Sequence, residues 1–274
     1  LRTQVERDPC LLSLSEEAIA YPTATTVNDP QFSSQTHLTG IQAPEAWDTF
    51  YSGLTGEVVI AIIDDGMQMD HPDLAAALWV NPDEIASNGV DDDGNGYIDD
   101  INGYNFASNI ASPAQQNGST HGTHVAGLAA AKDNNSVGIT GVMGRNVKIM
   151  ALNVFGTNPG SSAAAIVNAI NYARNKGAHV INMSLGGAGT ASTVNTAMIN
   201  AVAAGTFIAV AAGNDNQLVT SSAFVYPMGY SKDIEGAMAV GSVDAVTLEK
   251  SSFSNYSTTY VEIAAPGSDN NTGG

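Results

Sequence analysis

Short apolar runs alternate along the chain with segments whose apolar residues recur at helical spacing. The apolar runs occupy residues 58–63, 147–154, 180–183, 207–212 and 237–243, and each has the length of a buried strand. Helical spacing is clearest over residues 162–176 and 192–204, which end just before Gly177 and Gly205. Alternation of this kind predicts an α/β fold in three layers, with helices on both faces of a mostly parallel sheet.

Two stretches depart from this alternation. Residues 1–36 carry weak periodicity and three prolines, so we expect an N-terminal arm or the remnant of a propeptide, followed by one domain over residues 37–274. Residues 81–105 form a polar, glycine-containing insertion. The composition of this insertion predicts a metal-binding loop rather than a linker.

Charge and cysteine content narrow the possible partners. The chain carries 27 acidic and 9 basic residues, a formal charge of −18, which argues against binding to a phosphate backbone. Because no apolar run approaches the roughly 18 residues of a membrane span, we expect neither nucleic acid nor a membrane as partner. Cys10 is the single cysteine, and it is either a free thiol or the partner of a cysteine outside this sequence.

Three polar residues lie where apolar runs end or a helix begins. Asp64 follows the first run, His121 opens a helix of small residues through Ala131, and Asn214 follows the fourth run. Because parallel strands end at one edge of a sheet, we expect these side chains to gather there. A carboxylate beside an imidazole activates a hydroxyl nucleophile, and a side-chain amide stabilises an oxyanion. Taken singly, Asp64 also suits a helix cap or metal ligand, His121 a structural role and Asn214 a turn.

A series of motifs adds to this pattern. The segments are Asp-Asp-Gly at 64–66 with His-Pro-Asp-Leu at 71–74, His-Gly-Thr-His-Val-Ala-Gly at 121–127, Asn-Met-Ser-Leu-Gly-Gly at 182–187 and Ala-Ala-Gly-Asn at 211–214. In this order they resemble the subtilisin-like serine proteases, the subtilases, over most of the chain. The resemblance implies that Asp64, His121 and Asn214 are catalytic, with His121 rather than His124 as the base.

The same resemblance implies a secreted endopeptidase that cleaves extended polypeptides. Ser184, Leu185 and Gly186 would form one wall of the substrate cleft and pair with the peptide backbone, with residues 156–160 as the opposite rim. Tyr226-Pro227 matches a place where the family often has a cis proline, whereas base rates alone favour a trans turn. The sequence begins without a secretory signal, so a secreted protein would be represented here in processed form.

The nucleophile motif of the family is the main departure. No Gly-Thr-Ser-x-Ala segment occurs in residues 1–274. Because the family places an Ala-Pro-Gly turn, here residues 265–267, shortly before its nucleophile, we expect the serine on a C-terminal fragment that is separate or absent from this sequence. The alternative is a catalytically inactive relative that keeps the peptide-binding cleft. A nucleotide-binding domain is disfavoured, because no Gly-x-Gly-x-x-Gly segment follows the first apolar run.

The insertion contains a partial calcium-loop pattern. Oxygen-bearing side chains occupy positions 1, 3, 5 and 9 of the pattern, as Asp91, Asp93, Asn95 and Asp99. Position 6 is Gly96. Position 7 is Tyr97, whose backbone carbonyl would be the ligand. Position 12 is Asn102 where a glutamate is expected, so Asp100 is an alternative ligand. The pattern predicts bound Ca²⁺, and a solvated acidic turn is the simpler alternative.

A second calcium site is implied by the family resemblance. Asp73 and Asn135 match ligand positions, and the carbonyls of Asp133, Val137 and Ile139 would complete the shell. The loop over residues 133–138 is polar and lacks helical periodicity, as such a role requires. Calcium at either site would stabilise the folded chain, because a ligand that binds only the folded state shifts the equilibrium towards it.

Overall fold

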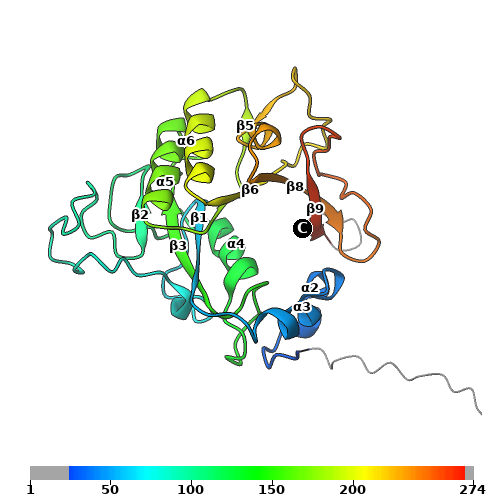
Figure 1. The fold of residues 1–274 in the computed structure, drawn as a ribbon, viewed down its shortest axis with the longest axis horizontal. Helices are drawn as coiled ribbons and strands as arrows, with labels where there is room; N and C mark the ends of the chain where they lie inside the picture. The colour runs from blue at the N-terminus through cyan, green and yellow to red at the C-terminus, as the bar shows by residue number, and fades with distance from the viewer. Residues whose placement is uncertain (1–24, 269–274) are drawn as a thin grey trace, which may run out of the picture.

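A parallel sheet of seven strands forms the centre of the molecule (Figure 1). The computed structural model describes residues 25–268, so Cys10 and most of the predicted N-terminal arm lie outside it. The strand order is β2-β3-β1-β4-β6-β8-β9. In this order the strands span Gly103–Asn105 (β2), Val147–Asn153 (β3), Val58–Asp64 (β1), Val180–Met183 (β4), Phe207–Ala211 (β6), Ala237–Asp244 (β8) and Ile263–Ser268 (β9). The two-residue strands β5 (Gly187–Ala188) and β7 (Val225–Tyr226) pair antiparallel beside it.

Helices cover both faces of this sheet, which confirms the predicted three layers (Figure 1). The helices α5 (Ala163–Asn175) and α6 (Ser192–Ala203) lie on one face, and α4 (His121–Ala130) lies on the other. Two short helices near the N-terminus, α2 (Thr36–Gly40) and α3 (Ala43–Phe50), lie on the same side as α4. Three 3₁₀ turns complete the described elements: η1 (Phe32–Ser34), η2 (Ala75–Ala77) and η3 (Met228–Asp233). No helix among residues 25–268 is long and apolar enough to cross a membrane.

The alternation of side chains along each strand divides the core into two layers. Ile181, Ile208 and Ala239 face α5 and α6 and are fully buried. On the opposite face, Ile62 and Ile149 pack against the alanines of α4. Burying each isoleucine side chain stabilises the fold by about 1.5–3 kcal/mol, so these two layers hold the sheet and its helices in register.

The predicted strands and helices agree with the structure to within one or two residues, with two corrections. The predicted loop at residues 81–105 ends in the edge strand β2, which pairs with β3 through residues 103–105. Residues 265–267, predicted as a turn, lie inside β9. A proline is tolerated there because β9 pairs only with β8 among the described residues, so Pro266 has no second strand to which it must donate.

Strand β1 lies where the direction of the chain connections reverses. After β1 the chain builds β2 and β3 on one side of it, then crosses to β4 on the other side. Loops leaving the carboxyl ends of β1 and β4 therefore separate and open a crevice, which is the usual position of binding sites in sheets of this type. Asp64 is the last residue of β1 and Ser184 follows β4 directly.

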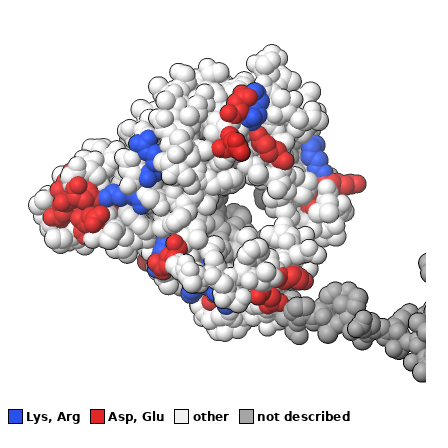
Figure 2. Space-filling view, viewed as in Figure 1, with Lys and Arg blue, Asp and Glu red and all other residues white. Residues whose placement is uncertain are grey.

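One part of the sheet is left open on the α4 side. The side chains of Asn182, Ala209, Ala211 and Val240 on this face are only partly buried, although parallel sheets are ordinarily covered on both faces. They line a hollow of about 270 Å³ together with residues 265–267 of β9. Figure 2 shows the molecule hollowed near its middle, and we call this region the open sheet face.

Residues 25–36 are tied to the domain rather than extended away from it. The carboxylate of Asp29 accepts hydrogen bonds from the N–H groups of Asn134 and Asn135. Gln35 exchanges two hydrogen bonds with the backbone of Thr140, at 2.8 and 2.9 Å. Both side chains are buried, so this part of the predicted arm closes over the loop at residues 133–140.

Candidate active site

Asp64 and His121 form a hydrogen-bonded pair at the carboxyl end of β1. Nδ1 of His121 lies 2.7 Å from Oδ1 of Asp64. The aspartate is 2% exposed, whereas the imidazole side chain is 55% exposed. The carboxylate is thus buried while the ring stays accessible, and both residues line one cavity. This is the arrangement of a general base whose tautomer is fixed by an anion.

The pair shifts the pKa of both partners. Burial raises the pKa of Asp64 above its ordinary value, although hydrogen bonds from His121 and from the N–H of Asp65 counteract part of this effect. The hydrogen bond to Asp64 raises the pKa of His121, against the opposing effect of burial, and the charge of Asp65 adds to the increase. A raised histidine pKa favours the imidazolium that forms once the ring has accepted a proton.

The start of α4 is held against the end of β1 by two glycines and one carboxylate. A Cβ on Gly122 would lie 2.2 Å from the carbonyl oxygen of Gly66, so only glycine allows this approach. Asp65 accepts hydrogen bonds from the N–H of Gly122, at 2.8 Å, and from the hydroxyl of Ser119. Further along the helix, a Cβ on Gly127 would make only an ordinary 3.6 Å contact with Ile139, so the packing does not require glycine there.

Asn214 lies on an exposed turn just after β6. Gly213 before it has φ of 101°, and a Cβ at that position would lie 2.4 Å from the side chain of Asn255. Asn255 is 1% exposed; its amide donates to the carbonyl of Ala212 and its oxygen accepts from the N–H groups of Asp215 and Gln217. The amide of Asn214 is therefore presented by a turn that a buried asparagine holds in place.

The predicted cleft wall separates two adjacent cavities. Ser184, Leu185 and Gly186 line a cavity of about 510 Å³ that also contains Asp64, His121 and residues 155–159. The same three residues line a second cavity, of about 750 Å³, with Asn214 and residues 221–225. The predicted catalytic and substrate-binding residues thus line two cavities that share residues 184–186, with Asp64 and His121 on one and Asn214 on the other, and we call the two cavities together the groove. The Tyr226–Pro227 bond beside it is cis, as the family resemblance implied.

Three positioning residues were missed by the sequence reasoning. Asp65 and Asn255 are described above; the third is Asn153, which is fully buried at the end of β3. Its amide donates to the carbonyls of Asp65 and Ala114, and its oxygen accepts from the N–H of Gly156. Asp65 could have been inferred because it adjoins Asp64. Asn153 and Asn255 carry no local signal of this role, because the carbonyls to which their amides donate lie 39 to 88 residues away in the sequence.

No serine hydroxyl is hydrogen-bonded to His121 within residues 25–268. Ser119 donates to Asp65, and Ser184 accepts from the amide of Asn182 at 2.9 Å. The serines near β9, Ser251 and Ser268, share a hydrogen bond with each other. The described residues therefore provide an anion, a base and an amide donor around a groove, without a nucleophile that is already bonded to the base.

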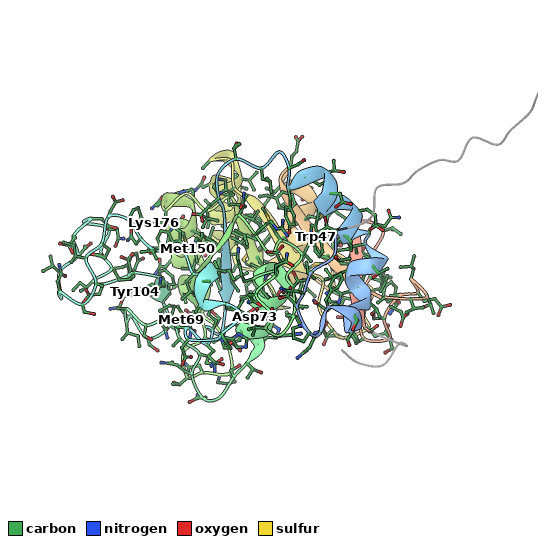
Figure 3. The ribbon with its side chains drawn as sticks, turned by 90° about the horizontal axis from the view of Figure 1, so that it is seen from below. Trp47, Met69, Asp73, Tyr104, Met150 and Lys176 are labelled. Carbon is green, nitrogen blue, oxygen red and sulfur yellow. The ribbon has the colours of Figure 1, made fainter. Side chains whose placement is uncertain are left out.

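The residues of the predicted second calcium site lie together beside α4, where Figure 3 labels Asp73. Asp73 is 2% exposed, and its carboxylate accepts from the side-chain amide of Asn135, at 2.7 Å, and from the N–H of Ile139, at 3.0 Å. The N–H of Val137 bonds to Oδ1 of Asn135. Asp133 pairs through its side chain with Arg145, which leaves its carbonyl for other partners. The buried Asp29 adds a carboxylate that the sequence reasoning missed.

The carboxylates of the predicted calcium loop point in different directions. Asp91 accepts from the N–H groups of Asn95 and Gly96, and Asp99 accepts from those of Asn88 and Gly89. Asp93 and Asn95 instead turn towards Asp100, which is fully buried. The ring of Tyr97 packs against Tyr104 and Tyr172 and anchors the loop to α5. Figure 2 shows the acidic side chains gathered on this projecting loop, at the left of the view.

Comparison with known proteins places these observations in a family. The sequence matches the description "Subtilase family" over residues 55–274. It is 38% identical over 244 residues to thermitase of Thermoactinomyces vulgaris, covering 89% of this chain and 74% of thermitase. It is 34% identical over 257 residues to the halolysin-like extracellular serine protease Nep of Natrialba magadii, covering 93% of this chain but only 42% of that protein. A solved protease from Pseudoalteromonas arctica PAMC 21717 superimposes with a TM-score of 0.68 at 35% identity, covering 89% of this chain and 73% of that one.

Proposed function

Because the chain belongs to the subtilase family of serine peptidases, we propose that it forms part of a secreted, calcium-stabilised endopeptidase that hydrolyses peptide bonds by an Asp-His-Ser mechanism. The observation that carries this proposal is the 2.7 Å hydrogen bond between His121 and the buried Asp64. The relative from Natrialba magadii is described as an extracellular serine protease, which supports the proposed secretion.

We assign both proton transfers of the reaction to His121. The neutral imidazole accepts the proton of an attacking serine hydroxyl at Nε2 and later donates it to the leaving amine. Asp64 keeps the proton of the ring on Nδ1 and stabilises the imidazolium. Because the carboxylate is buried and faces the ring, it needs little reorganisation when the charge forms.

The groove provides the remaining functions. Ser184, Leu185 and Gly186 bind the extended substrate through their backbone groups, opposite the rim at residues 155–159. Asn214 donates its side-chain amide to the oxyanion of the tetrahedral intermediate. Its place beside Ser184 in a shared cavity supports this role.

The nucleophile is supplied by a segment other than residues 1–274, either as a separate fragment or as a continuation. The open sheet face supports this part of the proposal. Its partly buried Ala209, Ala211 and Val240 leave an apolar surface beside the groove, and an additional helix there would complete the layer that α4 begins. A segment packed in this hollow would reach Ser184, which lines both the hollow and the cavity of His121.

A fluorophosphonate reagent tests this assignment directly. The native protein, treated with the reagent and mapped by mass spectrometry, is expected to carry one labelled serine, on a peptide outside residues 1–274. Heat-denatured protein should remain unlabelled, because the reaction needs the assembled site. Label on Ser184 or another serine of this chain would contradict the separate nucleophile. The absence of any label would favour the inactive peptide-binding relative.

Calcium stabilisation is the second part of the proposal. The chemistry of the donors fits a hard cation. The oxygen-bearing side chains of Asp73 and Asn135 meet beside α4, with the carboxylate of Asp29 bonded to the backbone of Asn135, and the acidic loop at residues 81–100 brings a second set of carboxylates together. When bound, Ca²⁺ would link segments that are distant in the sequence. Asp73 and Asn135, for example, are 62 residues apart.

Removal of calcium is expected to lower the melting temperature. A site whose ligand is held at 100 times its Kd adds about 2.7 kcal/mol to the free energy of unfolding, which in a chain of this size corresponds to about 5 °C for each site. Differential scanning calorimetry with excess EDTA, followed by restoration with CaCl₂, measures this shift. An equal EDTA treatment with MgCl₂ added back serves as control. A melting curve unchanged by EDTA would contradict both calcium sites.

A further inference from the structure

Three carboxylates from the acidic loop converge below its surface. One oxygen from each of Glu84, Asp93 and Asp100 lies within 4.8 Å of the other two. Two oxygens bound to a single Ca²⁺ at 2.3–2.6 Å lie at most about 5 Å apart, so these three can share one ion. Asp100 is fully buried and Glu84 is 9% exposed.

Most oxygens of this cluster already have partners, but one of Glu84 does not. The amide of Asn81 donates to Asp93 and to Asp100, both at 2.9 Å, and Asn95 donates to Asp100 at 2.8 Å. Oε1 of Glu84 accepts from the N–H of Asp92 at 2.7 Å. Oε2 of Glu84 is buried without a hydrogen-bond partner. A buried carboxylate oxygen left unpaired is costly, which indicates that a further ligand belongs beside it.

The charges of the cluster lead to the same conclusion. Lys176, at the end of α5, pairs with Asp93 and is the basic residue of the cluster. Figure 3 places Lys176 and Tyr104 at the side of the molecule where the loop projects. The three carboxylates of the cluster and the ammonium group of Lys176 together leave two negative charges uncompensated in a largely buried site. One divalent cation carries the matching charge.

We propose that Glu84, through Oε2, together with Asp93 and Asp100, binds one Ca²⁺ ion that fastens the acidic loop to the end of α5. An irregular set of carboxylate oxygens suits Ca²⁺ better than Mg²⁺, which requires near-octahedral geometry. The ligand set differs from the linear calcium-loop pattern, because the carboxylate oxygens of Asp91 and Asp99 accept hydrogen bonds from backbone N–H groups. The inference rests on the proposed calcium stabilisation and is independent of catalysis.

Terbium luminescence tests the ligand set in the full chain stripped of metal. Tb³⁺ replaces Ca²⁺, and Tyr172, whose hydroxyl donates to the carbonyl of Asp100 at 3.4 Å, is close enough to sensitise it. Glu84→Gln keeps the shape of the side chain but removes its charge, and is expected to weaken Tb³⁺ and competing Ca²⁺ binding about tenfold or more. Asp83→Asn is the matched control in the same loop: its side chain is exposed and lies outside the cluster, so binding should change less than about threefold.

A third variant separates loss of a ligand from damage to the loop. Lys176→Met removes the competing positive charge and is expected to strengthen Ca²⁺ binding, whereas mere loop damage would weaken it. If Asp83→Asn weakened binding as much as Glu84→Gln, a general loss of negative charge would explain both results and this ligand set would be wrong. Unchanged terbium emission in Glu84→Gln, with Lys176→Met no tighter, would also overturn it. Neither outcome bears on Asp73 or on fluorophosphonate labelling, so the failure of this inference and that of the proposed function are distinguishable.

Discussion

In the protease assembled with its nucleophile-bearing segment, Asp64→Asn is expected to reduce kcat by about 10⁴-fold, a magnitude known for the triad aspartates of serine proteases, subtilisin among them. The asparagine keeps the size of the side chain but cannot hold Nδ1 of His121 protonated as the carboxylate does. The ring then presents the wrong tautomer to the serine. Steady-state hydrolysis of a chromogenic peptide gives kcat and KM, and KM should change little because the groove is untouched.

The pH profile of this variant distinguishes a catalytic effect from misfolding. In the unaltered enzyme His121 must be neutral to act as a base, so activity falls as the pH drops through its raised pKa. Removing the charge of Asp64 lowers that pKa, and the acid limb of the residual activity should move to lower pH. Asp70→Asn, an exposed neighbour, should leave both rate and profile unaltered. An unshifted acid limb in Asp64→Asn would argue against the pairing with His121.

Asn214→Ala is expected to reduce kcat by about 10²–10³-fold, or about 2.7–4 kcal/mol, the magnitude that loss of this donor has in subtilisin itself. The amide acts on charge that develops in the transition state, so the loss should fall on kcat and leave KM nearly unchanged. Full kinetics on the same peptide substrate separate the two parameters.

Asn200→Ala provides the control for that measurement. This asparagine is exposed on α6, so its removal matches the chemical change without touching the groove. The control should retain full activity. A loss confined to KM in Asn214→Ala would mean that the residue binds the substrate in its ground state, and the oxyanion role would then have to be abandoned.

Much of the fold follows from patterns that are local in the sequence. The run at residues 207–212 has the length of one buried strand and ends at a glycine, and β6 occupies residues 207–211. The helix predicted over residues 162–176 is α5, capped by the hydroxyl of Ser162, which accepts from the N–H of Ala165 at 3.1 Å. Such elements are predictable because the period of their apolar residues and their caps are set within a few positions.

The edge strands were not predictable in the same way. β2 has only three residues inside a polar loop, and β9 contains a proline, so neither has a strand pattern of its own. Each forms because a neighbouring strand offers free backbone groups along its side. Pairing of this kind depends on the tertiary structure, and a single segment does not carry it.

The sequence by itself determined the alternating architecture, the order of the motifs and the identity of Asp64, His121 and Asn214 as candidates, because these depend on residue type and short spacing. Only the tertiary structure decided which carboxylates meet. It joined Asp64 to His121 across 57 positions and bonded Asn255 to Asp215, 40 residues away, in the turn that presents Asn214. It also turned Asp91 and Asp99 away from the cluster that Glu84 and Asp100 complete. The physical reason is that a carboxylate finds its partner through the direction of its side chain and its burial in the folded chain, and spacing along the sequence fixes neither.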